Sequence, residues 1–91
     1  MIRILIKNVW DALEDDPSVR EDLKMRSQLM IHIEKKIKKS GLTQQEAAKI
    51  LRITQPRVSA LLQGKIEEFR VGTLITLAHR IGLHVSLKVA A

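Results

Sequence analysis

The sequence predicts a mainly α domain of four to five helices that ends in a short β-strand. Its length of 91 residues fits one domain. Apolar residues recur at steps of three, four or seven through most of the chain, and residues with helix-capping chemistry precede these stripes. Near the C-terminus the pattern changes to an alternation of apolar and polar residues, which is typical of a half-buried strand.

The chain divides into an N-terminal segment, residues 1–18, and a folded domain, residues 19–91. Residues 2–7 are apolar and β-branched, which predicts a short strand, and residues 8–13 suit one helical turn. Asp16 has N-cap chemistry and precedes a proline, so the first long helix begins there and continues to about Lys39.

Two short helices follow in the prediction. Thr43 and Glu46 have the spacing of a capping box at the start of the first, which ends at about Leu51. Thr54 is the expected N-cap of the second, and Gly64 ends it.

Residues 65–70 are predicted to form a polar loop before a fourth helix at about 71–81. From Leu83 to Val89 the alternation predicts a half-buried strand. A single strand needs a partner for its backbone groups. The candidates are residues 2–7 of the same chain or a strand of a second subunit, and the two-subunit arrangement is favoured.

The charge is unevenly distributed along the chain. Residues 1–34 carry a net charge of −2, whereas residues 35–91 carry +8. A basic surface on a small domain favours a polyanionic partner, although it can also be a charged surface without one. The lysine cluster at residues 35–39 is equally well explained as a solvated helix end or as a non-specific phosphate contact. Aromatic residues are too few for the stacking that single-stranded nucleic acids require.

The sequence predicts neither an enzyme nor a cofactor or metal site. The chain has no cysteine, and its three histidines lack the spacing of metal ligands. Ser59 has only distant histidines and no orienting carboxylate, so it is not a candidate nucleophile. No apolar run approaches the roughly 20 residues that cross a bilayer, and the N-terminal apolar stretch is too short for a signal peptide. A cytoplasmic location without membrane attachment is therefore expected.

The pattern of residues 43–64 predicts two short helices, joined by a connection too short to let them separate. Such a pair crosses at a steep angle, which is the helix-turn-helix arrangement. The outer face of the second helix, the start of the first and the flanking cations are candidates for contact with double-stranded DNA. These candidates are Gln44, Thr54, Gln55, Pro56, Arg57, Ser59, Ala60, Gln63 and Lys65.

Several of these residues have the chemistry that the DNA major groove requires. Arg57 can pair bidentately with guanine O6 and N7, and Gln55 with adenine N6 and N7. Ser59 suits a base or a phosphate, and the methyl group of Ala60 suits a thymine methyl. Gln44 lies where a helix N-terminus can hold a phosphate. The alternative is that a pair of capped helices merely presents a solvated polar face.

The central motif resembles the Xre (lambda-Cro-type) helix-turn-helix family, and the residues that carry the resemblance are Gly41–Ala48, Ile53–Ser59 and Leu62–Lys65. The sequence resembles the HigA-like antitoxin branch in particular, and the residues that carry this closer resemblance are Asn8–Leu13, Phe69–Leu74 and Gly82–Leu83. The resemblance implies a lambda-repressor-like fold and a homodimer that binds an operator. It also implies repression of the protein's own operon and a small ribonuclease-type toxin as partner.

Two positions depart from the family pattern, and one further function is open. Arg52 stands where the connection usually has glycine, and Arg70 where the fourth helix usually has a serine or threonine cap.

The acidic run Asp11–Asp16 suits helix capping and a solvated face, or a docking site for a basic toxin. Trp10 suits a core anchor better than an interface. The alternative function is a toxin-neutralising interaction module that does not read DNA.

Overall fold

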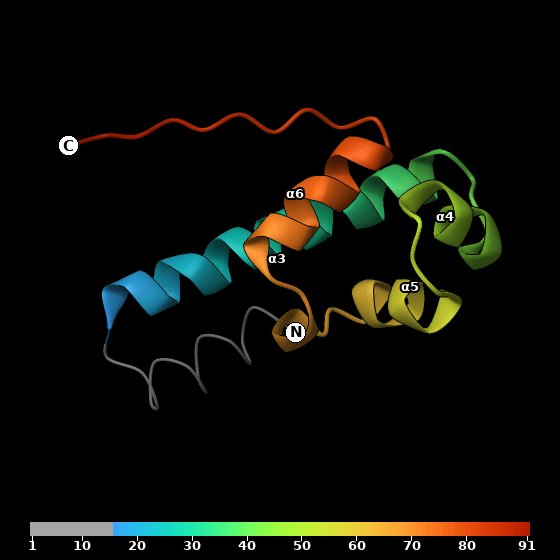
Figure 1. The fold of residues 1–91 in the computed structure, drawn as a ribbon, viewed down its shortest axis with the longest axis horizontal. Helices are drawn as coiled ribbons and strands as arrows, with labels where there is room; N and C mark the ends of the chain where they lie inside the picture. The colour runs from blue at the N-terminus through green and yellow to red at the C-terminus, as the bar shows by residue number, and fades with distance from the viewer. Residues whose placement is uncertain (1–15) are drawn as a thin grey trace.

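The longest element of the computed structural model, which describes residues 16–91, is helix α3 (Pro17–Lys39; Figure 1). Its start is defined locally, because the Asp16 carboxylate accepts hydrogen bonds from the Ser18 backbone N–H at 2.9 Å and from the Ser18 hydroxyl at 2.7 Å. These bonds lower the pKa of Asp16, the hydroxyl bond having the larger effect. The predicted N-cap and helix bounds are confirmed.

Three further α-helices and a short 3₁₀ helix complete the described part of the chain. They are α4 (Gln44–Leu51), α5 (Gln55–Leu62), the 3₁₀ helix η2 (Ile66–Glu68) and α6 (Val71–Arg80). α6 packs along α3, while α4 and α5 gather at the C-terminal end of α3 (Figure 1). The prediction of a mainly α domain is confirmed.

Capping residues start both short helices as predicted. At α4, the Thr43 hydroxyl accepts from the Glu46 N–H at 3.1 Å, and the Glu46 carboxylate accepts from the Thr43 N–H at 2.9 Å. At α5, the Thr54 hydroxyl accepts from the Arg57 N–H at 3.4 Å. α6 has no side-chain cap at Arg70, which confirms the weak start expected there.

One hydrophobic core joins all five helices. Its largest fully buried side chains come from the four α-helices and from the sole phenylalanine, which follows η2: Ile33, Leu51, Val58, Leu61, Phe69, Leu74 and Leu77. Small residues of α4, Ala47 and Ala48, are buried in the same core and allow the helices to approach closely. The core thus holds α4 and α5 as a rigid pair on the α3–α6 scaffold.

The connection between α4 and α5 contains a left-handed arginine. Arg52 has φ 59° and ψ 44°, and it is the one non-glycine residue with positive φ among residues 16–91. Its left-handed conformation lets the Ile53 N–H reach the Ala48 carbonyl at 3.1 Å. The guanidinium of Arg80, from α6, donates to the Leu51 carbonyl at 2.9 Å and so stabilises the same helix end.

Two predictions about irregular regions are not borne out. Residues 65–70 are not simply a polar loop, because they contain η2, and Ile66 and Phe69 are buried. The predicted β-strand at residues 83–89 is not borne out in the single chain: this segment is extended but has no strand pairing within residues 16–91 (Figure 1). Leu83 and Val85 pack partly on the core, as the alternation requires, but a strand also needs a neighbouring backbone.

The predicted strand at residues 2–7, the helical turn at 8–13, Trp10 and most of the acidic run at 11–16 lie outside the described residues. A boundary at residue 18 is not marked by a break, since α3 begins at Pro17. None of the described helices has the length and hydropathy needed to cross a membrane.

We expect Arg52→Gly to raise the free energy of unfolding by about 1 kcal/mol, because glycine has no Cβ to strain in the left-handed region. Equilibrium urea denaturation measures the change. Arg52→Ala is the control, since it removes the same side chain but keeps the Cβ. A glycine variant no more stable than the alanine variant would contradict the assigned strain.

The capping box predicts a pH-dependent contribution from Glu46. Hydrogen bonds from the Thr43 backbone N–H and, secondarily, its hydroxyl lower the pKa of Glu46 below its usual 4.5. A carboxylate with a lower pKa in the folded state stabilises the fold above the unfolded-state pKa, and the effect is lost as pH falls through the folded-state pKa.

We therefore expect Glu46→Gln to be less stable than the native chain at pH 7, with the difference narrowing as pH falls below 4.5. Urea denaturation at a series of pH values checks this. A difference that stays constant down to pH 3 would show that the Glu46 charge plays no part in the cap.

Candidate nucleic-acid interface

The helix pair α4–α5 exposes one polar row along α5. Gln55, Ser59 and Gln63 follow one another at intervals of four residues, so they lie on one side of the helix. Gln55 and Gln63 are exposed and Ser59 is half-buried. The Gln63 side-chain amide donates to the Ser59 hydroxyl at 3.0 Å, which orients both groups. The row therefore presents hydrogen-bonding groups outward in a partly fixed arrangement.

The N-terminus of α5 is exposed beside this row. Thr54, Gln55 and Pro56 are all exposed, and Pro56 occupies the first turn, where its missing N–H costs no helical hydrogen bond. The Thr54 hydroxyl satisfies one of the first-turn N–H groups. The helix dipole places partial positive charge at this end, so it favours contact with an anion.

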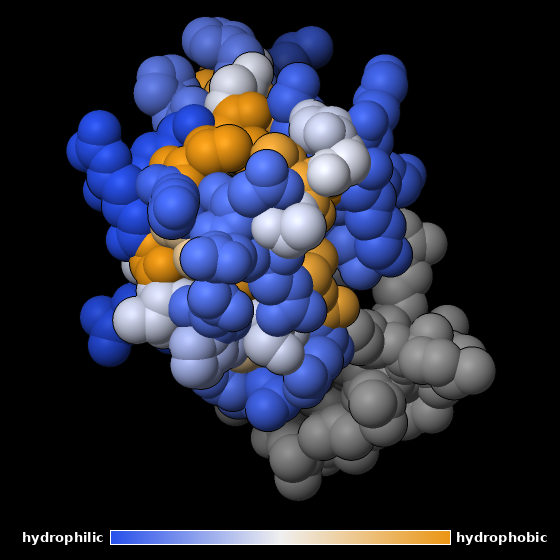
Figure 2. Space-filling view, turned by 90° about the vertical axis from the view of Figure 1, so that its right-hand side faces the viewer, coloured by the Kyte–Doolittle hydropathy of each residue, from blue (hydrophilic) through white to orange (hydrophobic). Residues whose placement is uncertain are grey.

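The N-terminus of α4 adds a second exposed helix start. Gln44 is its first residue and is exposed. Seen from the end of the molecule where α4 and α5 lie, the surface is largely hydrophilic, with apolar side chains showing between the polar ones (Figure 2). Lys65, which follows α5, is also exposed.

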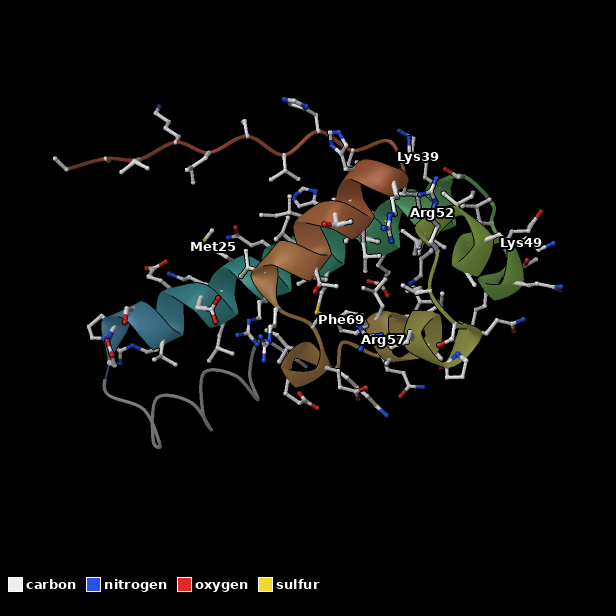
Figure 3. The ribbon with its side chains drawn as sticks, viewed as in Figure 1. Met25, Lys39, Lys49, Arg52, Arg57 and Phe69 are labelled. Atoms are coloured by element: carbon white, nitrogen blue, oxygen red, sulfur yellow. The ribbon has the colours of Figure 1, made fainter. Side chains whose placement is uncertain are left out.

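The charge of the helix pair is strongly biased. Between Thr43 and Lys65 the sequence has a single carboxylate, Glu46, and that group faces the Thr43 backbone in the capping box. Four cations stand in the same stretch: Lys49, Arg52, Arg57 and Lys65. Lys49 and Arg52 come from the end of α4 and the connection after it (Figure 3). A polyanion meets net attraction here.

Arg57 is placed differently from the expectation of a free outer side chain. Its guanidinium lies over the ring of Phe69, with 4.3 Å between Cζ and the ring centroid (Figure 3). One nitrogen donates to the Glu68 carbonyl at 3.0 Å. Arg57 is half-buried, and Phe69 is only 1% exposed. The cation is thus held against η2 by a cation–π contact and a hydrogen bond.

Ala60 is also placed differently. It was expected on the outer face, but it is 6% exposed and belongs to the hydrophobic core. Successive residues of an α-helix are rotated by about 100°, so Ala60 turns out of the row formed by its neighbour Ser59. Its methyl group is therefore not available to a thymine methyl.

The sequence prediction missed the part that Glu68 and Phe69 play in positioning Arg57. The available signal was the phenylalanine itself, because a large apolar side chain in a polar stretch is usually buried against other residues. No group of three or more potential metal ligands occurs within residues 16–91.

The stack predicts an energetic coupling between Arg57 and Phe69. A double-mutant cycle with Arg57→Ala and Phe69→Leu should give a coupling free energy of about 0.5–1 kcal/mol in urea denaturation, because each single change removes the same cation–π contact. Additive effects of the two changes would rule the contact out as a stabilising one.

Of the comparisons with known proteins, the one with family models agrees with this geometry. No curated protein matches the chain. The family model of the helix-turn-helix domain matches residues 12–90, which is most of the chain and includes the whole α4–α5 pair. Such a domain indicates a DNA-binding regulator and is typically not an enzyme. With its two capped short helices and its exposed polar row, the chain belongs to the helix-turn-helix domain family.

Proposed function

We propose that the protein binds a specific double-stranded DNA operator and represses transcription from it. The observation that carries this proposal is the polar row Gln55, Ser59 and Gln63, which stands beside the exposed N-terminus of α5. An α-helix fits the DNA major groove, where each base pair presents a distinct pattern of donors and acceptors. α5 is the helix proposed to enter that groove.

Gln55 is the principal base reader in this proposal. It is the first residue of α5 and is exposed, and its amide suits bidentate pairing with adenine N6 and N7. Ser59 and Gln63 approach the next bases as a hydrogen-bonded pair. Ala60 is left out of the proposed contacts because it is buried.

Arg57 is proposed to contact a guanine from its position over Phe69. A guanidinium has five N–H donors, and the hydrogen bond to the Glu68 carbonyl occupies one nitrogen. The stack restricts the rotamers of the side chain, so less conformational entropy is lost when it binds.

The remaining candidates are proposed to hold the DNA backbone. Gln44 and the first backbone N–H groups of α4 suit one phosphate, because the capping box uses only some of these donors. Thr54 and Pro56 flank the start of α5, and Lys65 follows its end. Such contacts fix the register of the protein on the duplex without reading its sequence.

Two copies are proposed to bind together as a homodimer. A two-fold dimer with one α5 in each of two successive major grooves would recognise half-sites about 34 Å apart on a roughly palindromic operator. An interface with a second chain would also stabilise a domain of only 91 residues, which buries a modest fraction of its surface alone.

We further propose that the protein is the antitoxin of a toxin–antitoxin pair that represses its own operon. The support is the resemblance of residues 69–74 and 82–83 to the HigA-like branch. A basic toxin is the proposed partner of the acidic run at residues 11–16. Within that run, Asp16 belongs to the N-cap of α3.

The test is binding of the native chain to its own upstream DNA and to unrelated DNA across a salt series. A specific regulator should hold the upstream fragment at salt concentrations that release the unrelated one. Gln55→Ala should weaken upstream binding by about 1–3 kcal/mol and leave the salt dependence unchanged, because glutamine carries no charge.

Gln28→Ala is the matched control, since it makes the same change at an exposed position of α3. It should bind like the native chain. Equal, weak and steeply salt-dependent binding of the native chain to both DNAs would contradict sequence reading and favour the toxin-neutralising interaction module.

A further inference from the structure

The segment after α6 carries apolar side chains that the described fold leaves uncovered. Leu83 and Val85 pack partly on the core, whereas Leu87 and Val89 are each 82% exposed. All four belong to one alternating series in an extended backbone, so they lie on one face of it. One half of an apolar face is therefore seated on the domain and the other half is not.

The backbone of this segment is suited to strand pairing. Within residues 16–91, the last backbone hydrogen bond is the one from the Leu83 N–H to the Ala78 carbonyl at 2.9 Å. Residues 84–91 contain no proline, so each of them has an N–H donor. In Figure 1 the segment runs as a single extended trace away from the end of α6.

We infer that this segment pairs with the same segment of a second copy, as an antiparallel two-stranded ribbon whose two-fold axis passes at Ser86. The inference rests on the homodimer proposed above and specifies its interface. The argument for a second copy is the self-complementarity of the sequence about that residue.

An axis at Ser86 places residue 86 + n of one strand opposite residue 86 − n of the other. Val85 then faces Leu87, and Leu83 faces Val89, in both directions. Directly opposed residues of an antiparallel pair lie on the same face and contact each other. Each exposed residue is thus placed beside a residue of the other copy that already packs on its core.

Other registers fit the pattern less well. An axis between two residues would put apolar side chains opposite polar ones, since a shift of one residue reverses the faces. An axis at Leu87 would leave Leu83 opposite Ala91, and an axis at Val85 would put Val89 opposite Ile81, which is the C-cap of α6. Ser86 is the position that matches all four large apolar residues with one another.

The absence of cysteine from the native chain makes disulfide trapping a direct test of the register. In the full chain, Ser86→Cys should give a covalent dimer under mild oxidation. Opposed Cα atoms in antiparallel strands are about 4.5–5.5 Å apart, which lies within the range that a disulfide bridges.

His84→Cys and Lys88→Cys are the matched controls on the same polar face. Each is offset from its own copy by about 13 Å along the ribbon, so neither should form a homodimer alone. A mixture of the two variants should form the mixed disulfide, because residue 84 faces residue 88. Equal trapping of all three single variants, or none at Ser86, would overturn the inference.

A second measurement uses the apolar face. The combined variant Leu87→Ser, Val89→Ser should weaken self-association by about tenfold or more in analytical ultracentrifugation, since exposed side chains would no longer be buried. A native chain that is monomeric at all concentrations, as pairing with residues 2–7 would make it, contradicts the inference.

The two proposals fail in distinguishable ways. A Ser86-trapped dimer that does not prefer the upstream DNA would refute the proposed function and leave the interface intact. Specific DNA binding by a dimer that Ser86→Cys does not trap would refute the interface alone.

Discussion

The three-residue connection between α4 and α5 is the constraint on which the rest of the surface depends. Because it is so short, the orientation of α5 follows from the end of α4. A left-handed Arg52 makes the turn, and the Arg80 guanidinium of α6 binds the carbonyl at which α4 ends. Helix α6 therefore holds α4 directly, and the polar row of α5 is held both by the short connection and by the packing of α5 on α3 and α4.

The features that could be predicted from the sequence are those that residues within a few positions determine. Asp16, Thr43 and Thr54 each cap a helix by a hydrogen bond that spans two or three residues. Such local bonds depend little on the tertiary fold, so the helix bounds followed. The left-handed Arg52 was not predicted in this way, because only the resemblance, whose pattern has glycine there, marked the position as unusual.

What could not be predicted depends on groups far apart or on another chain. The buried Ile66 and Phe69 needed the core around them, and the position of Arg57 needed Phe69. Ala60 lies at the margin between two faces of a short helix, where periodicity alone does not assign burial. The C-terminal alternation identified the correct inner residues, Leu83 and Val85, but a strand is a property of two backbones.

The stack of Arg57 on Phe69 has a consequence for how the proposed DNA preference of such a domain can change over evolution. Gln55 is exposed, so a new side chain there alters the DNA-facing surface at little cost to folding. Arg57 contacts a residue of the core, so its replacement would also remove a contact that holds η2. Substitutions should therefore accumulate first at Gln55, at the start of α5. Arg57 should be retained until the core around Phe69 also changes.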